Sequence, residues 1–257
     1  MTPLVYYAVG SEPKDRYYYG LLRKSLTTLL RHYSGPVLII ADRDIRVPSP
    51  RVTVKRMPMR NHYERYEARL WIGRAIGREV DHRVIRALYL DVDTIITGSI
   101  DALFAQCREH GLYYATEPPD MYIGDAYNGR YAMSFAESSE AWSKKLTAYN
   151  SGVCLASLGY AEPLFDQIAK VFQDAVARHV GLSYPEKGYL MDQSALNTVI
   201  YRGIIKPIVF PPGLVGIGVK DTDMARHTIL HFNGASRKRM DRFAPPEQDL
   251  IPIEGLE

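Results

Sequence analysis

The apolar positions along the chain follow two different periods. Residues 5–9 and 37–41 are short apolar runs bounded by turn residues, which predicts two buried strands. Between them, leucines recur at three- and four-residue spacing over residues 18–33, which predicts an amphipathic helix that ends at Gly35-Pro36. Strand and helix signals that alternate in this way are typical of an α/β fold, in which a mostly parallel sheet is flanked by helices.

The rest of the chain continues this alternation, with one exception. We expect further strands at residues 52–57, 84–90, 152–156, 206–210 and 228–232, and further helices at residues 63–76, 99–104, 162–179 and 191–201. Between residues 117 and 149 the apolar period weakens while Pro, Gly and Tyr accumulate, which predicts a long loop or lid. Its aromatic side chains can stack on a sugar or pack in the core. They are Tyr122, Tyr127, Tyr131, Trp142 and Tyr149.

Composition narrows the class of protein. A chain of 257 residues with 46% hydrophobic and 24% charged residues fits a single domain with one sizeable core. No run approaches the roughly 20 apolar residues of a membrane span, and no basic segment precedes a long apolar run at the N-terminus. Only two cysteines occur, Cys107 and Cys154, without CxxC spacing. We therefore expect a cytoplasmic protein without a transmembrane segment.

The charge distribution suggests an anionic ligand. The net charge is only +3, but basic residues gather in residues 51–86 and again in residues 237–242. The sequence contains no zinc-finger, RNP or basic-zipper pattern, so we do not expect nucleic acid as the partner. The second basic cluster could also contact an acidic membrane surface, which makes peripheral membrane contact possible.

Two carboxylates carry the clearest chemical signal. Asp91 and Asp93 lie at positions i and i+2, directly after the predicted strand 84–90. Ligands bind at the carboxyl ends of strands in open α/β sheets, and both side chains can reach one cation there. Mg²⁺ or Mn²⁺ would bridge such carboxylates to phosphate oxygens. The alternative is a pair of solvated turn aspartates.

Four separated motifs then occur in a characteristic order. They are Tyr89-Leu90-Asp91-Val92-Asp93-Thr94 with Ile100-Asp101-Ala102-Leu103-Phe104, then Asn150-Ser151-Gly152-Val153, then Asp192-Gln193 with Leu196-Asn197, and finally His231-Phe232-Asn233-Gly234. The ordered set resembles the glycosyltransferase family that contains glycogenin and the bacterial lipopolysaccharide glucosyl- and galactosyltransferases. The resemblance spans most of the chain.

This resemblance implies both a fold and a reaction. It implies a single GT-A domain over residues 1–257, with a Rossmann-like nucleotide-sugar-binding half over about 1–105 and an acceptor- and sugar-binding half over about 106–257. The implied reaction is transfer of a hexose, with retention of configuration, from a nucleotide-sugar donor that is UDP-linked in most of the family. The acceptor would be a hydroxyl of a carbohydrate, a glycolipid or a protein.

The resemblance also implies the roles of individual residues. Asp91, Asp93 and His231 would bind the metal, and an imidazole beside carboxylates suits Mn²⁺ better than Mg²⁺, although Mg²⁺ is possible. The catalytic residues around the transferred sugar would be Asn150, Asp192 and Gln193, which can hydrogen-bond hydroxyls and stabilise an oxocarbenium-like centre. As alternatives, His231 could be a satisfied core histidine and Asp192 an ordinary aspartate at a helix N-terminus.

The implied donor-binding residues are Ala8, Val9, Tyr17, Arg69, Val92, Gly234, Arg237 and Lys238. The alternative interpretation is that Arg69 is an ordinary arginine on the surface of a helix. The chain departs from the family pattern at two of these places. Arg237-Lys238-Arg239 replaces the usual Lys-Pro-Trp, so either Arg237 or Lys238 could contact the diphosphate. Val9-Gly10-Ser11-Glu12 lacks the usual Thr, Asn and Asp cluster for the base, which leaves the nucleotide open.

Two other functions fit part of these motifs. Asp91-Val92-Asp93-Thr94 also matches the Asp-x-Asp-x-Thr motif of haloacid-dehalogenase-like phosphatases, with Asp91 as the nucleophile and residues 219–223 as the nearest further acidic motif. That motif normally opens the core domain, and the phosphatase alternative leaves Asn150, Asp192-Gln193 and His231 unexplained. A nucleotide-sugar-binding protein without catalysis is the third possibility.

Overall fold

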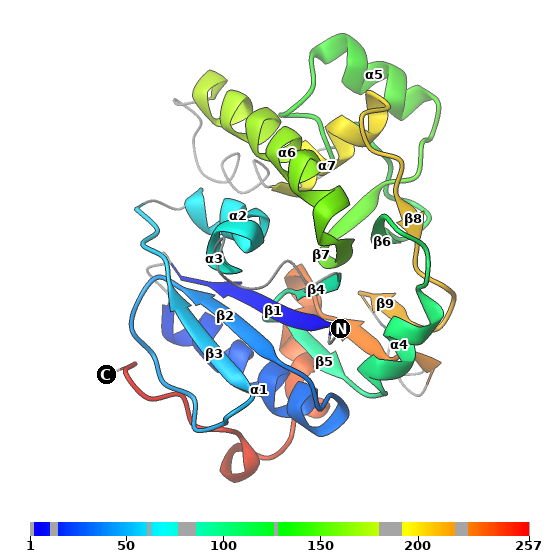
Figure 1. Cartoon of the computed structure of the whole chain (residues 1–257). Coiled ribbons are helices and arrows are strands. Elements are labelled where there is room, and N and C mark those ends of the chain that lie inside the picture. Colours follow the sequence, from blue (N-terminus) through cyan, green and yellow to red (C-terminus); the bar gives the residue numbers. More distant parts are fainter. Residues whose placement is uncertain are drawn as a thin grey trace.

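The computed structural model describes residues 3–10, 15–60, 63–76, 86–125, 128–179, 192–218 and 226–256 (Figure 1). Its central sheet has seven strands: β1 (Leu4–Val9), β2 (Val37–Ala41), β3 (Val52–Arg56), β4 (Arg86–Leu90), β6 (Leu112–Thr116), β7 (Tyr149–Ser157) and β8 (Ile208–Val209). They are arranged in the order β3-β2-β1-β4-β7-β6-β8. Neighbours run parallel except beside β7, which is antiparallel to β4 and β6. This mixed, mostly parallel sheet confirms the expected fold class.

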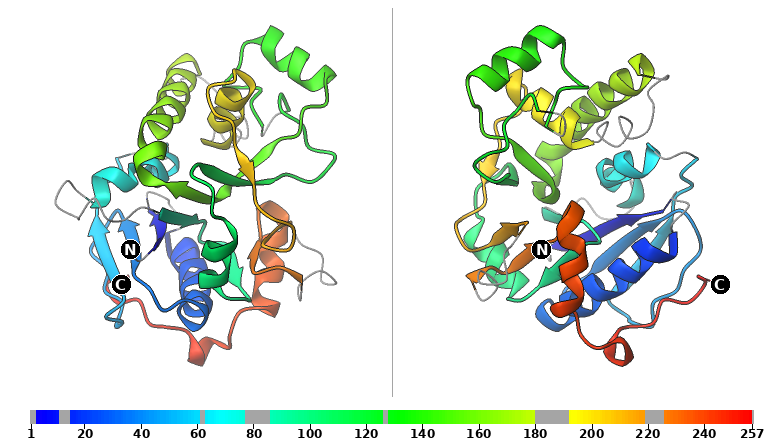
Figure 2. Two further views of the ribbon diagram at one scale, coloured as in Figure 1. Left: turned by 45° about the vertical axis from the view of Figure 1, so that its right-hand side comes forward. Right: turned by 180° about the vertical axis from the view of Figure 1, so that it is seen from behind.

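Helices cover both faces of the sheet (Figures 1 and 2). One face is covered by α1 (Asp15–His32), and the other by α3 (Ile72–Ile76) and α6 (Leu158–Arg178). Side chains of β1 alternate between the two sides, since Val5 and Tyr7 belong to the α1 core whereas Leu4 and Tyr6 belong to the core with α3 and α6. A strand buried on both faces explains the continuous apolar run that predicted it.

A second, small sheet joins two segments that are far apart in sequence. It consists of β5 (Thr94–Ile96), β10 (Ile229–His231) and β9 (Val215–Ile217), in the order β5-β10-β9. Strand β10 is antiparallel to β5, with His231 opposite Thr94, and parallel to β9. The predicted strand 228–232 is confirmed as β10, whereas the three-residue strands β5 and β9 were not predicted.

The segment predicted as a long loop contains ordered structure. Helix α5 (Phe135–Ser143) begins with a capping box, in which the Ser134 hydroxyl accepts from Glu137 N and the Glu137 carboxylate accepts from Ser134 N. An isolated bridge pairs Tyr122 with Thr147. The Tyr122 ring packs edge-to-face on Trp142, with ring centroids 5.6 Å apart. The loop prediction was therefore wrong for residues 135–143, and these two aromatic side chains pack on each other.

The predicted helices are confirmed with shifted ends. The helix expected at 63–76 is divided into α2 (Glu64–Ala68), the 3₁₀ turn η1 (Arg69–Trp71) and α3. The others are α4 (Ile100–Gln106), which Ser99 caps as expected, and α7 (Asp192–Tyr201), followed later by the 3₁₀ segments η4 (Gly234–Arg242) and η5 (Glu247–Asp249). Residues 84–85 and 191 and Tyr127 lie outside the described residues.

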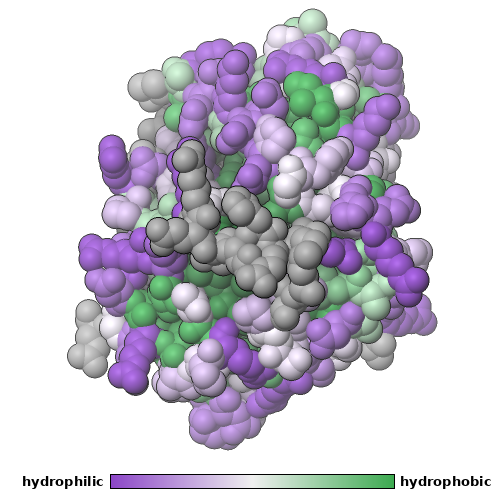
Figure 3. Space-filling view, viewed as in Figure 1, coloured by the Kyte–Doolittle hydropathy of each residue, from purple (hydrophilic) through white to green (hydrophobic). Residues whose placement is uncertain are grey.

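The helices of the described ranges do not include one that is long and apolar enough to cross a membrane. Hydrophilic side chains occupy most of the face shown in Figure 3, with smaller hydrophobic areas between them.

Candidate active site

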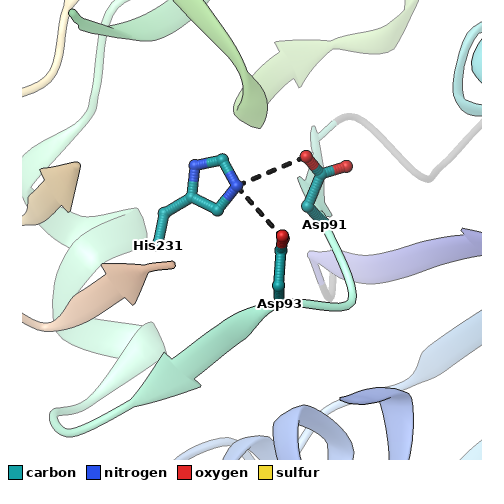
Figure 4. A group of neighbouring side chains, drawn as sticks. All are labelled: Asp91, Asp93 and His231. Atoms are coloured by element: carbon teal, nitrogen blue, oxygen red, sulfur yellow. Dashed lines mark hydrogen bonds and ion pairs between the residues drawn. The ribbon is translucent and has the colours of Figure 1, made fainter. Parts of the chain in front are cut away.

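Two aspartates and a histidine meet at the end of β4 (Figure 4). Asp91 directly follows β4, Asp93 directly precedes β5, and His231 is the last residue of β10. The His231 Nε2 atom lies 3.1 Å from Asp93 Oδ1 and 3.4 Å from Asp91 Oδ2. One ligand atom from each residue lies within 4.8 Å of the others. Two carboxylates and an imidazole nitrogen this close together form a donor set that fits Mn²⁺.

Strand pairing, rather than proximity in sequence, positions His231. The β5–β10 ladder places His231 opposite Thr94, and Phe232 N donates to Asp93 O at 2.9 Å. Asp93 and His231 are both 2% exposed, so this part of the site is closed to bulk solvent. His231 is therefore buried, as the core-histidine alternative proposed, but its Nε2 faces two carboxylates.

Gly152 lies directly against His231 and Asp91. Asp91 N donates to Gly152 O at 2.7 Å, because β4 pairs with β7. A Cβ atom on Gly152 would lie 2.2 Å from His231 Cε1 and 2.5 Å from Asp91 Oδ2. The glycine of the Asn150-Ser151-Gly152 motif is therefore required for Asp91 and His231 to approach each other.

Charges in the site are strongly coupled. Burial favours the neutral form of Asp91, but Arg69 and His231 outweigh it and hold the pKa of this carboxyl well below its usual range. Burial likewise opposes the charged form of His231, but Asp93 and Asp91 raise its pKa to about 10. The Tyr89 hydroxyl donates to Asp91 Oδ1 at 2.6 Å. The Asp91 carboxylate is thus held as an anion, the form that binds a cation.

Arg69 connects the aspartate pair to α7. Its guanidinium lies 2.9 Å from Asp192 Oδ2 and 3.6 Å from Asp91 Oδ1, and it donates to Ser151 O at 3.0 Å. The residue is only 9% exposed, so it is not the surface arginine of the alternative interpretation. Burial raises the pKa of Asp192 to about 6, although the charge of Arg69 counteracts this effect. The structure thus places Asp192 and Asp91 on the two sides of one guanidinium.

A buried network of amides and one carboxylate adjoins Asp192. Gln193 Nε2 donates to Glu117 Oε1 at 2.7 Å and to Asn128 Oδ1 at 2.8 Å, and Gln193 Oε1 accepts from Ser151 N at 3.1 Å. Asn150 Nδ2 also donates to Glu117 Oε1, at 2.9 Å. Both amide hydrogens of Gln193 are therefore used within the protein.

Glu117 and Asn128 belong to this network and are not among the site residues predicted from the sequence. Glu117 is 4% exposed, and its Oε2 atom has no hydrogen-bond partner among the residues that the structure describes. A signal for Glu117 was available, because it follows the apolar run 112–116 just as Asp91 follows β4. The accumulation of Pro, Gly and Tyr after it predicts the start of a loop there instead. Asn128 offered no such signal, since it comes from the irregular part of that loop.

The expected donor-binding residues fall into two groups. Arg237 is close to the aspartate pair, since its Nε donates to Asp93 Oδ2, whereas Lys238 is exposed. Gly234 has a φ of +51°, a backbone conformation that favours glycine. Val92 is buried between the two aspartates. The second group lies elsewhere: Ala8 and Val9, at the end of β1, pair with β2, and Tyr17, in α1, is 47% exposed.

Comparison with known proteins gives a match at the level of structure. No protein-family model matches the sequence, and no curated protein matches it. Among solved structures, the chain is similar to the bifunctional glycosyltransferase WbbM in its apo form, with 13% identity and a TM-score of 0.56 over 96% of this chain. The chain spans 50% of the length of that protein.

Two further matches cover almost the whole chain of the solved structure. The galactosyltransferase LgtC, in complex with donor and acceptor sugar analogues, matches with 15% identity and a TM-score of 0.54. An active-site mutant of LgtC matches with 14% identity and a TM-score of 0.55. Each match covers 96% of this chain and 98% of the other. The chain therefore has the fold of these glycosyltransferases, as the order of its motifs predicted.

Proposed function

We propose that this protein is a metal-dependent, retaining glycosyltransferase that moves a hexose from a nucleotide-sugar to an acceptor hydroxyl. We propose UDP as the nucleotide of this donor. The cluster of Asp91, Asp93 and His231 carries the proposal, because three separate elements bring these side chains together in a chain with a glycosyltransferase fold. We propose Mn²⁺ as the cation, with Mg²⁺ as the alternative. Bound there, the cation would supply Lewis-acid stabilisation of the diphosphate leaving group.

The diphosphate side of the proposed site depends on Arg237. Its guanidinium already lies against Asp93, so a diphosphate held at the aspartate pair would be within reach of this fixed positive charge. Lys238 is exposed and is the second candidate. Val92 and Gly234 would contact the ribose and the diphosphate, while Ala8, Val9 and Tyr17 would bind the nucleoside. These roles follow the motif resemblance.

The sugar side of the proposed site is the buried polar network. Asp192, held by Arg69, provides a fixed negative charge where positive charge develops at the anomeric carbon. Gln193 and Asn150 hold one oxygen of Glu117, which leaves its Oε2 atom as an acceptor for a sugar hydroxyl. We therefore assign Gln193 a positioning role and Glu117 a contact with the sugar.

The reaction would not require a protein base. The acceptor oxygen bonds to the anomeric carbon as the bond between that carbon and the phosphate oxygen breaks. The acceptor proton passes to the departing diphosphate, on the same face of the sugar, which agrees with retention. The acceptor would be a carbohydrate, glycolipid or protein hydroxyl. Residues 1–105 would form the nucleotide-sugar-binding half, and residues 106–257 would bind the acceptor and the transferred sugar and also contribute His231, Gly234 and Arg237 to the metal and diphosphate.

The phosphatase alternative receives less support. It requires Asp91 as a free nucleophile, but this carboxylate is engaged by Arg69, His231 and Tyr89. Its further acidic motif, residues 219–223, lies outside the described residues.

Replacing Asp93 with Asn tests the proposal. We expect the Asp93→Asn variant to lose about 10³-fold or more in Mn²⁺-dependent transfer, because Lewis-acid stabilisation contributes several kcal/mol. The measurement is release of nucleoside diphosphate from a panel of nucleotide-sugars with mixed acceptors. Asp44→Asn is the matched control, since Asp44 is 79% exposed and pairs only with Arg56 in the contacts observed.

Three outcomes would count against the proposal. Undiminished metal-dependent transfer by Asp93→Asn would remove the metal site from the mechanism. Hydrolysis of p-nitrophenyl phosphate by the wild type, with phosphate bound covalently to Asp91, would establish the phosphatase. Binding of UDP with Mn²⁺ but no turnover with any donor and acceptor would indicate a binding protein.

A further inference from the structure

Gly10 directly follows β1, in the segment that lacks the usual polar cluster for the base, and Asp42, which directly follows β2, lies over it. Gly10 has a φ of +141°, a conformation that favours glycine. A Cβ atom on Gly10 would lie 2.4 Å from Asp42 Cγ and 2.7 Å from Asp42 Oδ1. The carboxyl group of Asp42 therefore occupies the space that the β1 side chain leaves.

Helix α1 holds this carboxylate in place. The hydroxyl of Tyr19, a fully buried side chain, donates to Asp42 Oδ1 at 3.0 Å. Arg43 Nε donates to the same oxygen at 3.2 Å, and its guanidinium lies over the Tyr19 ring at 5.5 Å. The Asp42 side chain is 13% exposed. An acceptor held in one orientation costs little conformational entropy when it binds a ligand.

The sheet places Asp42 on the same edge as the candidate metal ligands. Asp42 directly follows β2 and Asp91 directly follows β4, and β1 lies between these two strands and runs parallel to both. Two strand spacings amount to roughly 10 Å, the scale of one nucleoside. In comparable α/β folds a carboxylate after the second strand of the first βαβ unit hydrogen-bonds a nucleoside hydroxyl.

We propose that Asp42 recognises the nucleoside of the donor, in place of the polar side chains that β1 lacks. The inference rests on the proposed function as a nucleotide-sugar transferase. The carboxylate can only accept hydrogen bonds, so its partner must be a donor. Two donors of a uridine nucleotide qualify: a ribose hydroxyl and the ring N–H of uracil. Cytosine has an acceptor at the equivalent ring position and would be disfavoured.

Calorimetric titration of UDP, 2′-deoxy-UDP and CDP, each with Mn²⁺, tests this assignment in the wild type and in Asp42→Asn. We expect Asp42→Asn to bind UDP about ten- to a hundredfold more weakly, the range for a hydrogen bond to a charged group. If the partner is the base, the variant also loses the preference for UDP over CDP. If the partner is a ribose hydroxyl, the variant loses the preference for UDP over 2′-deoxy-UDP and keeps the preference for UDP over CDP.

Two further variants make the test specific. Tyr19→Phe keeps the buried ring but removes the hydroxyl that orients Asp42, so we expect a smaller loss of UDP affinity with the same change in selectivity. This variant also serves if Asp42→Asn does not fold, as judged by circular dichroism. Asp44→Asn changes the same charge two residues away and should leave all three affinities unchanged.

The outcomes separate this inference from the function on which it rests. If Asp42→Asn and Tyr19→Phe bind all three nucleotides as the wild type does, the role of Asp42 is confined to contacts within the protein, and the inference fails while the transferase proposal stands. If the wild type binds none of the three nucleotides, the proposal of a UDP-linked donor fails and the inference fails with it.

Discussion

At the scale of single residues, the candidate metal site requires that residue 152 is a glycine, without a side chain. Gly152 lies against both Asp91 and His231, so this close approach requires a hydrogen atom at its α-carbon. The motif resemblance associates Asn150 of the Asn150-Ser151-Gly152 motif with the sugar. The contact of Gly152 with the metal ligands was unpredictable, because it arises from the pairing of β7 with β4 and the packing of β10 beside them.

We expect Gly152→Ala to weaken Mn²⁺ binding by about 10- to 100-fold, the usual effect of disturbing the surroundings of a metal ligand. The added methyl group must displace His231 or Asp91, whereas φ at this position imposes no additional strain, since Gly152 is not among the positive-φ residues. Manganese affinity by electron paramagnetic resonance is the measurement. Gly159→Ala is the matched control, because its Cβ would meet nothing within 4 Å. Equal Mn²⁺ affinities in the two variants would contradict the proposed ligand set.

At the scale of elements, α5 shows where sequence patterns failed. The capping box Ser134-x-x-Glu137 was a readable start signal, but the helix has almost no apolar periodicity, since Phe135 and Trp142 are 88% and 49% exposed. Besides the burial of Ala141 and the contact of Trp142 with Tyr122, polar contacts tie it to the fold, from Arg202 to Glu137 and from the Tyr201 hydroxyl to Glu140. Such long-range polar contacts leave no periodic signal in the sequence.

The stability contributed by Glu137 should depend on pH in the acid range. The Arg202 guanidinium lowers the pKa of Glu137 to about 2, below its value in the unfolded chain. Its contribution is therefore complete above about pH 4.5 and is lost as the pH falls towards 2. We expect Glu137→Gln to lower Tm by about 2–4 °C at pH 7, corresponding to about 1 kcal/mol.

Thermal unfolding of the wild type and Glu137→Gln at several pH values between 7 and 2.5 measures this contribution. The difference in Tm should shrink as the pH falls. Glu109→Gln, at an exposed position, serves as the control. A difference in Tm that stays constant down to pH 2.5 would show that the ion pair and capping box do not carry it.

At the scale of the whole molecule, the parallel half of the sheet was predictable and the antiparallel half was only partly so. The buried run of β1 and the short runs of β2 and β4 identified parallel strands, and the position of Asp91 after β4 followed from them. The insertion of β7 between β4 and β6, and the joining of β5 to β10, depend on pairing between distant segments. The order of the motifs, rather than apolar periodicity, predicted that His231 lies beside the two aspartates.

Thermal unfolding tests whether Asp91, Asp93 and His231 bind a nucleotide-sugar through a divalent cation. Wild type and Asp93→Asn are each heated with Mn²⁺ alone, UDP-sugar alone, and both together. For the wild type we expect a rise in Tm of about 5–10 °C with both ligands at about 100 times Kd and a much smaller rise with either alone. For Asp93→Asn we expect no joint effect of the two ligands. A wild-type shift from UDP-sugar that is the same without Mn²⁺, or that persists in Asp93→Asn, would contradict binding through the cation.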